Sequence, residues 1–507
     1  MAQGKVWIKK LANEFEQHPT PSAANELYET ALLYGLTTDI SNSAIGLALQ
    51  HRKKIAPLNI APRQHIAAPA STTLDKNALI ATNDSQQEIN RLRKMLYINP
   101  NLPLSWSELA RHFLTLGEQK KAIRCMYAAI KLAKHNRYVC RVASRLFINV
   151  KDHDQALHLL RSNPYFKKDP WLLAAEIATS TSAGKQSQYI SNAKQIILLN
   201  DFTNYQVSEL AAAIGTVELS HGSSKQAKIM FDKSLIAPTD NSLAQAQWAI
   251  GQDAKISIPS IAWQTPSSFE ANTLLARQEQ NWEVALNSCI KWLADEPFSL
   301  RPAQMGSYIA FLPEHNKISE EFATAGLRRD KLNITLLNNR AVALTYQGKL
   351  NEALTDFKTA MNSDGANNSP HLLATLGLIA FGSGFAEIGR ECYEKAMYWF
   401  IDRKDGLSTK EAILTLLRQE IRHNPSSIPA SIIIIERILK TLILTKQPEI
   451  CGLANLVLKE ALAGAILIPQ TYVPSISSQE LNHFISLFNN PKNLYSPLTI
   501  LNYSKFI

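Results

Sequence analysis

The sequence predicts an all-α protein, an α-solenoid of helical hairpins, and two observations support this. Residues 103–136 place bulky side chains along two helices and small residues where the two backbones would cross closely. The same spacing returns later in the chain, in one 34-residue register that starts from Pro266, Leu300 and Ile334. A single short apolar pattern is ambiguous, whereas repetition at one period is typical of repeat proteins. The recurrence therefore supports the fold class more strongly than any one segment.

The landmarks of the first clear hairpin are spaced as in a known repeat. They are Trp106, Leu109, Ala110, Phe113, Gly117, Ala122, Met126 and Ala129. This pattern resembles the tetratricopeptide repeat (TPR), whose unit is 34 residues. The resemblance covers about residues 90–403 and implies a TPR-like right-handed superhelix. It also implies a protein-binding surface, as in bacterial TPR proteins of the scaffold or adaptor type, with no catalytic group and no cofactor.

The chain before the repeats has two parts. Residues 1–54 contain three short helical patterns and are expected to form an N-terminal helical region. Residues 55–77 contain three prolines and no helical or strand period, which indicates an extended linker or a strap. The charged N-terminus lacks an apolar core of signal-peptide length, so we expect a cytoplasmic protein.

The repeats are expected in two arrays. A first, basic array spans residues 85–250, and a second array spans 266–405. Between them, residues 251–265 are too irregular for a helical hairpin and predict a seam. From 406 to 507 the repeat signature fades while helical patterns persist, which predicts a C-terminal helical cap and tail, since terminal repeats of solenoids are atypical.

The positive charge of the chain is concentrated in one segment. The whole chain has a net charge of +10, whereas Arg91 to Lys168 contains sixteen Lys and Arg and four Asp and Glu, a net +12. The remainder of the chain must then sum to −2. This asymmetry favours a partner that is acidic, phosphorylated or a nucleic acid.

The TPR resemblance selects a set of groove residues within this basic segment. In the family, phases 2, 5, 9, 12 and 13 of each unit face the concave groove, and these phases give Arg111, Arg141 and Arg145. Arg137 precedes the last two on one helix face, at spacings of four, and Asn149 continues that face. With no acid among them in the sequence, these arginines are expected to be unpaired and to bind carboxylates or phosphates. A secondary basic face is expected on the outward helix and includes Lys120, Lys121, Arg124, Lys131 and Lys134, where a merely solvated surface is the simpler interpretation.

Motifs for catalysis and metal binding are absent or weak. The segment GSSKQAK at 222–228 lacks the phosphate-loop spacing, and His153 and His158 have no zinc-type partners nearby. Five scattered cysteines indicate free thiols and not a disulfide framework. No metal site and no enzyme activity are therefore expected.

Three functions remain open in this order. The first is a non-catalytic scaffold or adaptor that binds an acidic or phosphorylated segment of a protein partner, with a regulatory subunit of a multi-protein bacterial system as one form of this role. The second is nucleic-acid binding through residues 91–168, which predicts affinity that falls steeply with salt. The third is an unrecognised enzymatic site in a terminal region. The oligomeric state is not predicted.

Overall fold

The computed structural model describes residues 12–13, 84–199, 201–252, 254–312, 314–444, 448–463 and 476–489. Within these ranges every regular element is a helix, as the repeat pattern predicts. The expected N-terminal helical region (1–54), the linker (55–77) and the tail after Pro491 lie outside the described residues, apart from positions 12–13. No described helix is both long and apolar enough to cross a bilayer.

The described helices belong to two compact units. Unit 1 contains the described residues up to Leu274, and unit 2 contains those from Leu275 onward. The division falls inside α15 (Phe269–Gln278), just after the irregular segment that holds η3 (Ser260–Gln264). The two arrays and the seam remain predictions as domain boundaries.

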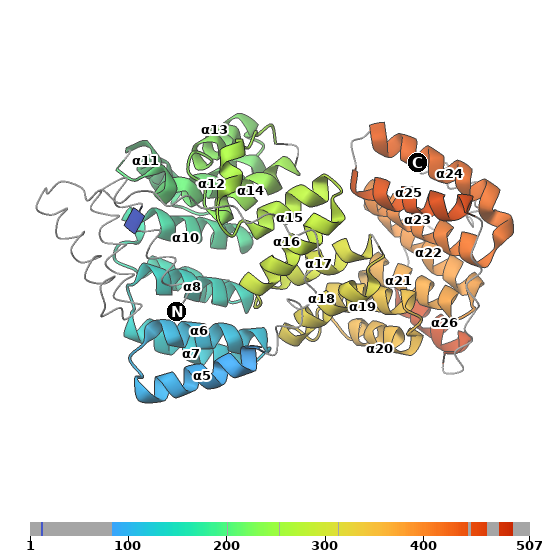
Figure 1. Cartoon of the computed structure of the whole chain (residues 1–507), viewed down its shortest axis with the longest axis horizontal. Helices are drawn as coiled ribbons and strands as arrows, with labels where there is room; N and C mark the ends of the chain where they lie inside the picture. The colour runs from blue at the N-terminus through green and yellow to red at the C-terminus, as the bar shows by residue number, and fades with distance from the viewer. Residues whose placement is uncertain are drawn as a thin grey trace, which may run out of the picture. The chain divides into compact units, whose positions relative to one another are not determined.

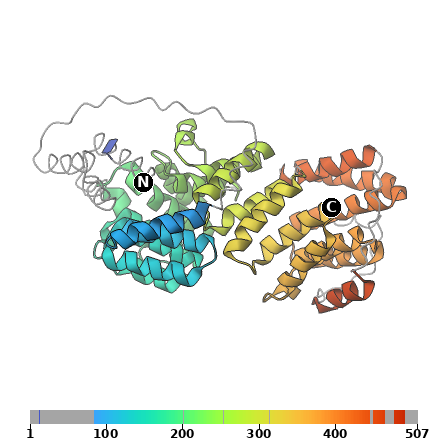
Figure 2. The same cartoon turned by 60° about the horizontal axis from the view of Figure 1, so that its bottom comes forward.

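Unit 1 is a run of antiparallel hairpins preceded by one helix. Figures 1 and 2 show its consecutive helices lying side by side, coloured from blue to green. In chain order they are α5 (Asp84–Ile98), α6 (Pro103–Thr115), α7 (Gln119–Leu132), α8 (Arg137–Asn149), α9 (His153–Arg161), η2 (Phe166–Lys168), α10 (Pro170–Ser182), α11 (Ile190–Leu199), α12 (Asn204–Ser220), α13 (Ser224–Ser234) and α14 (Asp240–Ile250). The expected hairpin at 103–136 is confirmed as α6–α7, and α8–α9 forms the next hairpin.

Unit 2 continues the same architecture. Its helices after α15 are α16 (Trp282–Asp295), α17 (Leu300–Phe311), α18 (Asn316–Arg329), α19 (Ile334–Tyr346), α20 (Leu350–Met361), η4 (Ala366–Asn368), α21 (Pro370–Gly382), α22 (Ala386–Asp402), α23 (Gly406–His423), η5 (Pro425–Ser427), α24 (Ile428–Leu444), α25 (Pro448–Leu462) and α26 (Ser478–Leu487). The last helix, α26, packs back on α21 and α22. Phe484 of α26 meets the ring of Phe357 edge-on, with ring centroids 5.3 Å apart.

Hairpin ends follow from local sequence. Pro103, Pro170 and Pro370 each begin a first helix, where the missing N–H has no intrahelical partner to lose. Gly117, Gly222, Gly348 and Gly384 have positive φ in the turns between paired helices, a conformation that glycine adopts without strain. The chain therefore reverses at the positions that the repeat pattern predicts.

The helices of a hairpin cross closely because a small residue faces a ring sixteen positions later. A methyl group on Gly215 would lie 2.9 Å from two ring carbons of Phe231, and one on Gly377 would lie 2.9 Å from the ring of Tyr393. In the α17–α18 hairpin the corresponding pair is Gly306 and Phe322, which are also sixteen positions apart. These rings are fully or almost fully buried, and they form the core of each hairpin.

Candidate functional site

Two arginines of α8, Arg137 and Arg141, are neutralised by acids from later hairpins. Arg137 Nε donates to Asp169 Oδ2 at 2.5 Å, and Arg141 pairs with Glu209. Asp169 also caps α10 by accepting from the backbone N–H groups of Trp171 and Leu172. The expectation that these arginines are unpaired is therefore wrong, because the superhelix brings in acids that lie 32 and 68 residues further along the chain.

A polar network joins three first helices across this face of unit 1. Glu209 on α12 accepts from Arg141 on α8 and from Asn241 Nδ2 on α14 at 3.1 Å. Asn241 Oδ1 in turn accepts from Arg145 Nη2 at 3.0 Å. The guanidinium of Arg141 also lies 4.8 Å above the ring of Trp171. The side chains of Arg141 and Arg145 on α8 therefore make contacts within unit 1.

The two remaining groove candidates also have partners within the chain. Arg111 Nη1 donates to Glu108 at 3.1 Å, a pair within α6. Asn149 Nδ2 donates to the backbone oxygen of Arg145 at 2.9 Å. A role of these five residues in partner binding stays a prediction, and their bonds within the chain make it a weaker one.

The secondary basic face lies on the surface as expected from the sequence. Lys120, Lys121, Arg124 and Lys131 of α7 and Lys134 beyond it are all exposed. Lys121 Nζ lies 3.2 Å from Glu118, and both of those side chains are about half exposed. Exposed pairs of this kind contribute little free energy, so the cations stay available to a partner.

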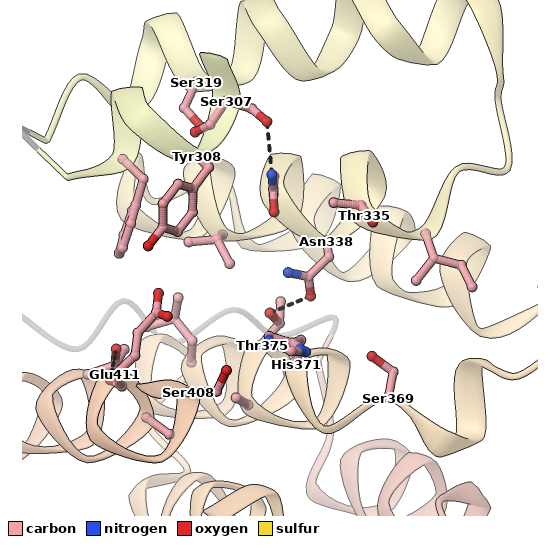
Figure 3. A pocket seen from close by; sticks show the side chains of 18 of the residues that line it. Ser307, Tyr308, Ser319, Thr335, Asn338, Ser369, His371, Thr375, Ser408 and Glu411 are labelled. Carbon is pink, nitrogen blue, oxygen red and sulfur yellow. Dashed lines mark hydrogen bonds between the residues drawn. The ribbon is translucent and has the colours of Figure 1, made fainter. Parts of the chain in front are cut away.

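A cavity lies in unit 2, on the side formed by the first helices of successive hairpins. It has a volume of about 410 Å³. Figure 3 shows Ser307, Tyr308 and Asn338 on one side of this groove, and His371, Thr375 and Ser408 on the other. Most of the lining comes from α17, α19, α21 and α23, with Ser319 added from α18 and Tyr393 and Phe400 from α22. We call this cavity the unit 2 groove.

Two neighbouring asparagines on α19 each use one polar atom of the side-chain amide in a hydrogen bond to another helix of unit 2. Asn338 Oδ1 accepts from the hydroxyl of Thr375 on α21 at 2.7 Å, and Asn339 Nδ2 donates to Ser307 on α17 at 2.9 Å. Within the described chain, Asn338 Nδ2 and Asn339 Oδ1 have no partner. The pair therefore offers the groove one donor and one acceptor, which complement a backbone C=O and N–H.

The groove has little charge. Among its described lining residues, Glu411 is the one with a formal charge near pH 7. Partial desolvation lowers the pKa of His371, although Asp405 opposes this effect, so its imidazole is neutral at that pH. No Lys or Arg lines the described walls, and so the groove is unsuited to an acidic or phosphorylated segment.

A buried ion cluster holds α23 in place. Arg418 of α23, whose side chain is 1% exposed, donates from Nε to both carboxylate oxygens of Glu460 on α25 at 3.0 and 3.1 Å. Arg418 also pairs with Glu314, which follows α17. Burial would raise the pKa of Glu460, but hydrogen bonds from Arg418 and Arg422 outweigh burial and lower it. The groove wall formed by α23 is thereby fixed relative to α17 and α25.

The sequence contained a signal for the groove residues. The phase rule that selected the α8 arginines also selects Thr335 and Asn338, at phases 2 and 5 of the hairpin that starts at Ile334. It likewise gives Gln304 and Tyr308 in the preceding hairpin, and all four line the groove. These four residues are uncharged, so the pattern of positive charge does not point to them.

The described residues contain no group of three or more His, Cys, Asp or Glu arranged to hold a metal ion. No protein-family model matches the chain, and no curated protein matches it. Several solved structures are similar to it, and two of them have the following values. The crystal structure of yeast Tom70 matches at 12% identity and a TM-score of 0.30, over 81% of this chain and 99% of that one. A circular tandem repeat protein with novel repeat topology and enhanced subunit contact surfaces matches at 10% identity and a TM-score of 0.14, over 91% and 85%.

Proposed function

We propose that this protein is a non-catalytic interaction scaffold that binds an extended segment of a partner protein in the unit 2 groove. The observation that carries the proposal is the asparagine pair. Asn338 presents a donor and Asn339 an acceptor, and each is oriented by its own bond to a neighbouring helix. An extended peptide has unpaired backbone donors and acceptors on both sides, so it can satisfy such a pair whatever its side chains.

The lining residues restrict the side chains of the bound segment. Phe311, Val342 and Leu378 provide apolar surface beside the asparagines. Glu411 adds a negative charge at one end, and a like charge placed beside it would be repelled. The preferred segment is therefore neutral or basic with medium-sized apolar side chains. An acidic or phosphorylated segment, which the sequence favoured, is not proposed for this groove.

The sharpest test is Asn338→Asp, because the change keeps the shape of the side chain. The carboxylate still accepts from Thr375, so the fold keeps that hydrogen bond, while the donor that faces the groove is replaced by a charged acceptor. A buried backbone carbonyl left without its donor costs about 1–3 kcal/mol, and we expect peptide affinity to fall at least about tenfold. Asn101→Asp is the matched control, since Asn101 is exposed in unit 1.

The measurement uses a phage-displayed library of random dodecapeptides, selected on the full chain. Enriched peptides are labelled and titrated by fluorescence anisotropy against the wild type and both variants. The proposal holds if the peptides are neutral or basic and Asn338→Asp alone weakens them. It is overturned if no peptide is enriched, or if the enriched peptides bind Asn338→Asp as tightly as the wild type. A regulatory role in a multi-protein bacterial system, and nucleic-acid binding as the alternative, stay predictions.

A further inference from the structure

A second cleft lies on the first hairpin of unit 1, outside the α8 network. The helices α5 and α7 both pack against α6 and leave between them a cleft of about 420 Å³. Its residues come from all three helices, and it is formed within unit 1 alone. We call it the α5–α7 cleft.

The inside of the α5–α7 cleft is apolar and aromatic. Leu96, Leu109 and Phe113 are buried residues that line it, and Tyr97 at its edge is 92% exposed. The indole of Trp106 is held in place because its Nε1 donates to the backbone oxygen of Pro100 at 2.8 Å. A ring as exposed as that of Tyr97 beside an apolar cleft is an unusual loss of hydrophobic burial, and it suits a surface that a partner covers.

Three cations surround the cleft. The guanidinium of Arg93 lies 5.3 Å from the centroid of the Phe113 ring, and Lys121 Nζ lies 5.7 Å from it. Arg124 completes the set. Within the described chain, Arg93 and Arg124 have no carboxylate at ion-pair distance, and Glu118 partners Lys121 on the surface. These cations therefore differ from Arg137 and Arg141, which the fold itself neutralises.

We propose that the α5–α7 cleft binds an acidic peptide segment that inserts one bulky apolar side chain. The side chain fills the apolar interior between Leu109 and Tyr97, while carboxylates on either side of it meet Arg93, Lys121 and Arg124. Arginine forks match carboxylates in paired hydrogen bonds, and the apolar anchor supplies most of the affinity. A nucleic acid would need a track of cations along its backbone, whereas these three cations line a single apolar cleft.

The test uses two labelled peptides of one design, a phenylalanine between two runs of three aspartates, and the same peptide with alanine at the centre. They are titrated by fluorescence anisotropy against the full chain. The cleft variant is Arg93→Glu with Arg124→Glu, both at exposed positions. The matched control is Lys131→Glu with Lys134→Glu, which makes the same charge change on exposed residues that do not line the cleft. A third variant, Tyr97→Ser, removes the aromatic edge alone.

The phenylalanine peptide is expected to bind at least about tenfold more weakly to the Arg93→Glu, Arg124→Glu variant and within about twofold to the control. The alanine peptide and the Tyr97→Ser variant are each expected to show a loss of about fivefold or more. Equal losses in the cleft and control variants would reduce the interaction to net charge and overturn the proposal. The proposal is also overturned if a labelled oligothymidine of twelve nucleotides binds more tightly than the peptide and displaces it. The Asn338→Asp variant serves as a further control, since it leaves this site intact and separates the two proposals.

Discussion

Gly377 of α21 fixes how closely α21 and α22 approach each other, and replacing it with alanine tests the packing. A methyl group at this position would lie 2.9 Å from Tyr393 Cδ2, 3.0 Å from Cys392 Cβ and 3.0 Å from the backbone oxygen of Gly389. Ordinary van der Waals contacts lie at about 3.5–4.0 Å. The backbone oxygen cannot move without α22, and Tyr393 is almost fully buried. The methyl group therefore forces the two helices apart.

Two opposing effects decide the magnitude. Overpacking by one methyl group in a closed core costs about 1–3 kcal/mol. Alanine inside a helix is favoured over glycine by about 1 kcal/mol. The steric cost is expected at the upper end because three contacts are violated at once and one of them is to backbone. The net loss in free energy of unfolding is then about 1–2 kcal/mol, or a fall in melting temperature of about 3–6 °C for a unit of this size.

The assay is differential scanning calorimetry of the full chain, read at the transition that Gly377→Ala displaces. Gly406→Ala is the matched control, because a methyl group there meets no atom within 4 Å and the residue begins α23. The control is expected to be neutral or slightly stabilising. Tyr393→Leu combined with Gly377→Ala should recover part of the loss, since the smaller side chain makes room. A Gly377→Ala variant as stable as the control would refute the close crossing of α21 and α22.

The remaining predictions concern charged groups. Arg141→Glu should destabilise unit 1 by about 2 kcal/mol in urea unfolding, because it sets a second carboxylate against Glu209, and the swap with Glu209→Arg should restore most of it. Arg418→Met should cost about 3 kcal/mol by the same assay, since it leaves the partly buried Glu460 with a single arginine, whereas an unchanged midpoint would contradict the cluster. Burial and the neighbouring Arg422 lower the pKa of His423, so the unfolded chain takes up the proton first. Stability from this group is complete above about pH 6.5 and falls below it, and His423→Phe should flatten the melting temperature between pH 7.5 and 5.5.

The helical hairpins could be predicted because their information is local. A small residue and a bulky one sixteen positions later lie in the same hairpin, as for Gly215 with Phe231, and the turn glycines lie between them. The prolines that begin α6, α10 and α21 add the starting points. Each of these features depends only on residues within one repeat, so the repeat pattern is enough to predict the hairpins.

The electrostatics of the site could not be predicted in the same way. The acids that pair with Arg137 and Arg141 come from α10 and α12, and their position depends on how successive hairpins rotate about the superhelix. The residue order shows a basic segment with a net charge of +12, but it does not show which acids pair with those cations. In contrast, Asn338 was accessible to the phase rule, because that rule concerns one hairpin only. The position of a residue within its hairpin therefore predicts its side of the fold, whereas its charge does not predict its ion-pair partner.

The Arg141–Glu209–Asn241–Arg145 network has a consequence for how unit 1 unfolds. In a simple solenoid each repeat touches only its neighbours, so stability adds up pair by pair and end repeats can fray independently. Here α8 is joined to α12 and α14, and the hairpin of α10 and α11 lies between them in the chain. Unfolding of α8, or of α12 and α14, would therefore break hydrogen bonds that hold the other part of the network. Hydrogen exchange across α8 to α14 should accordingly report one shared opening event, with common protection for hairpins that are not adjacent in the chain.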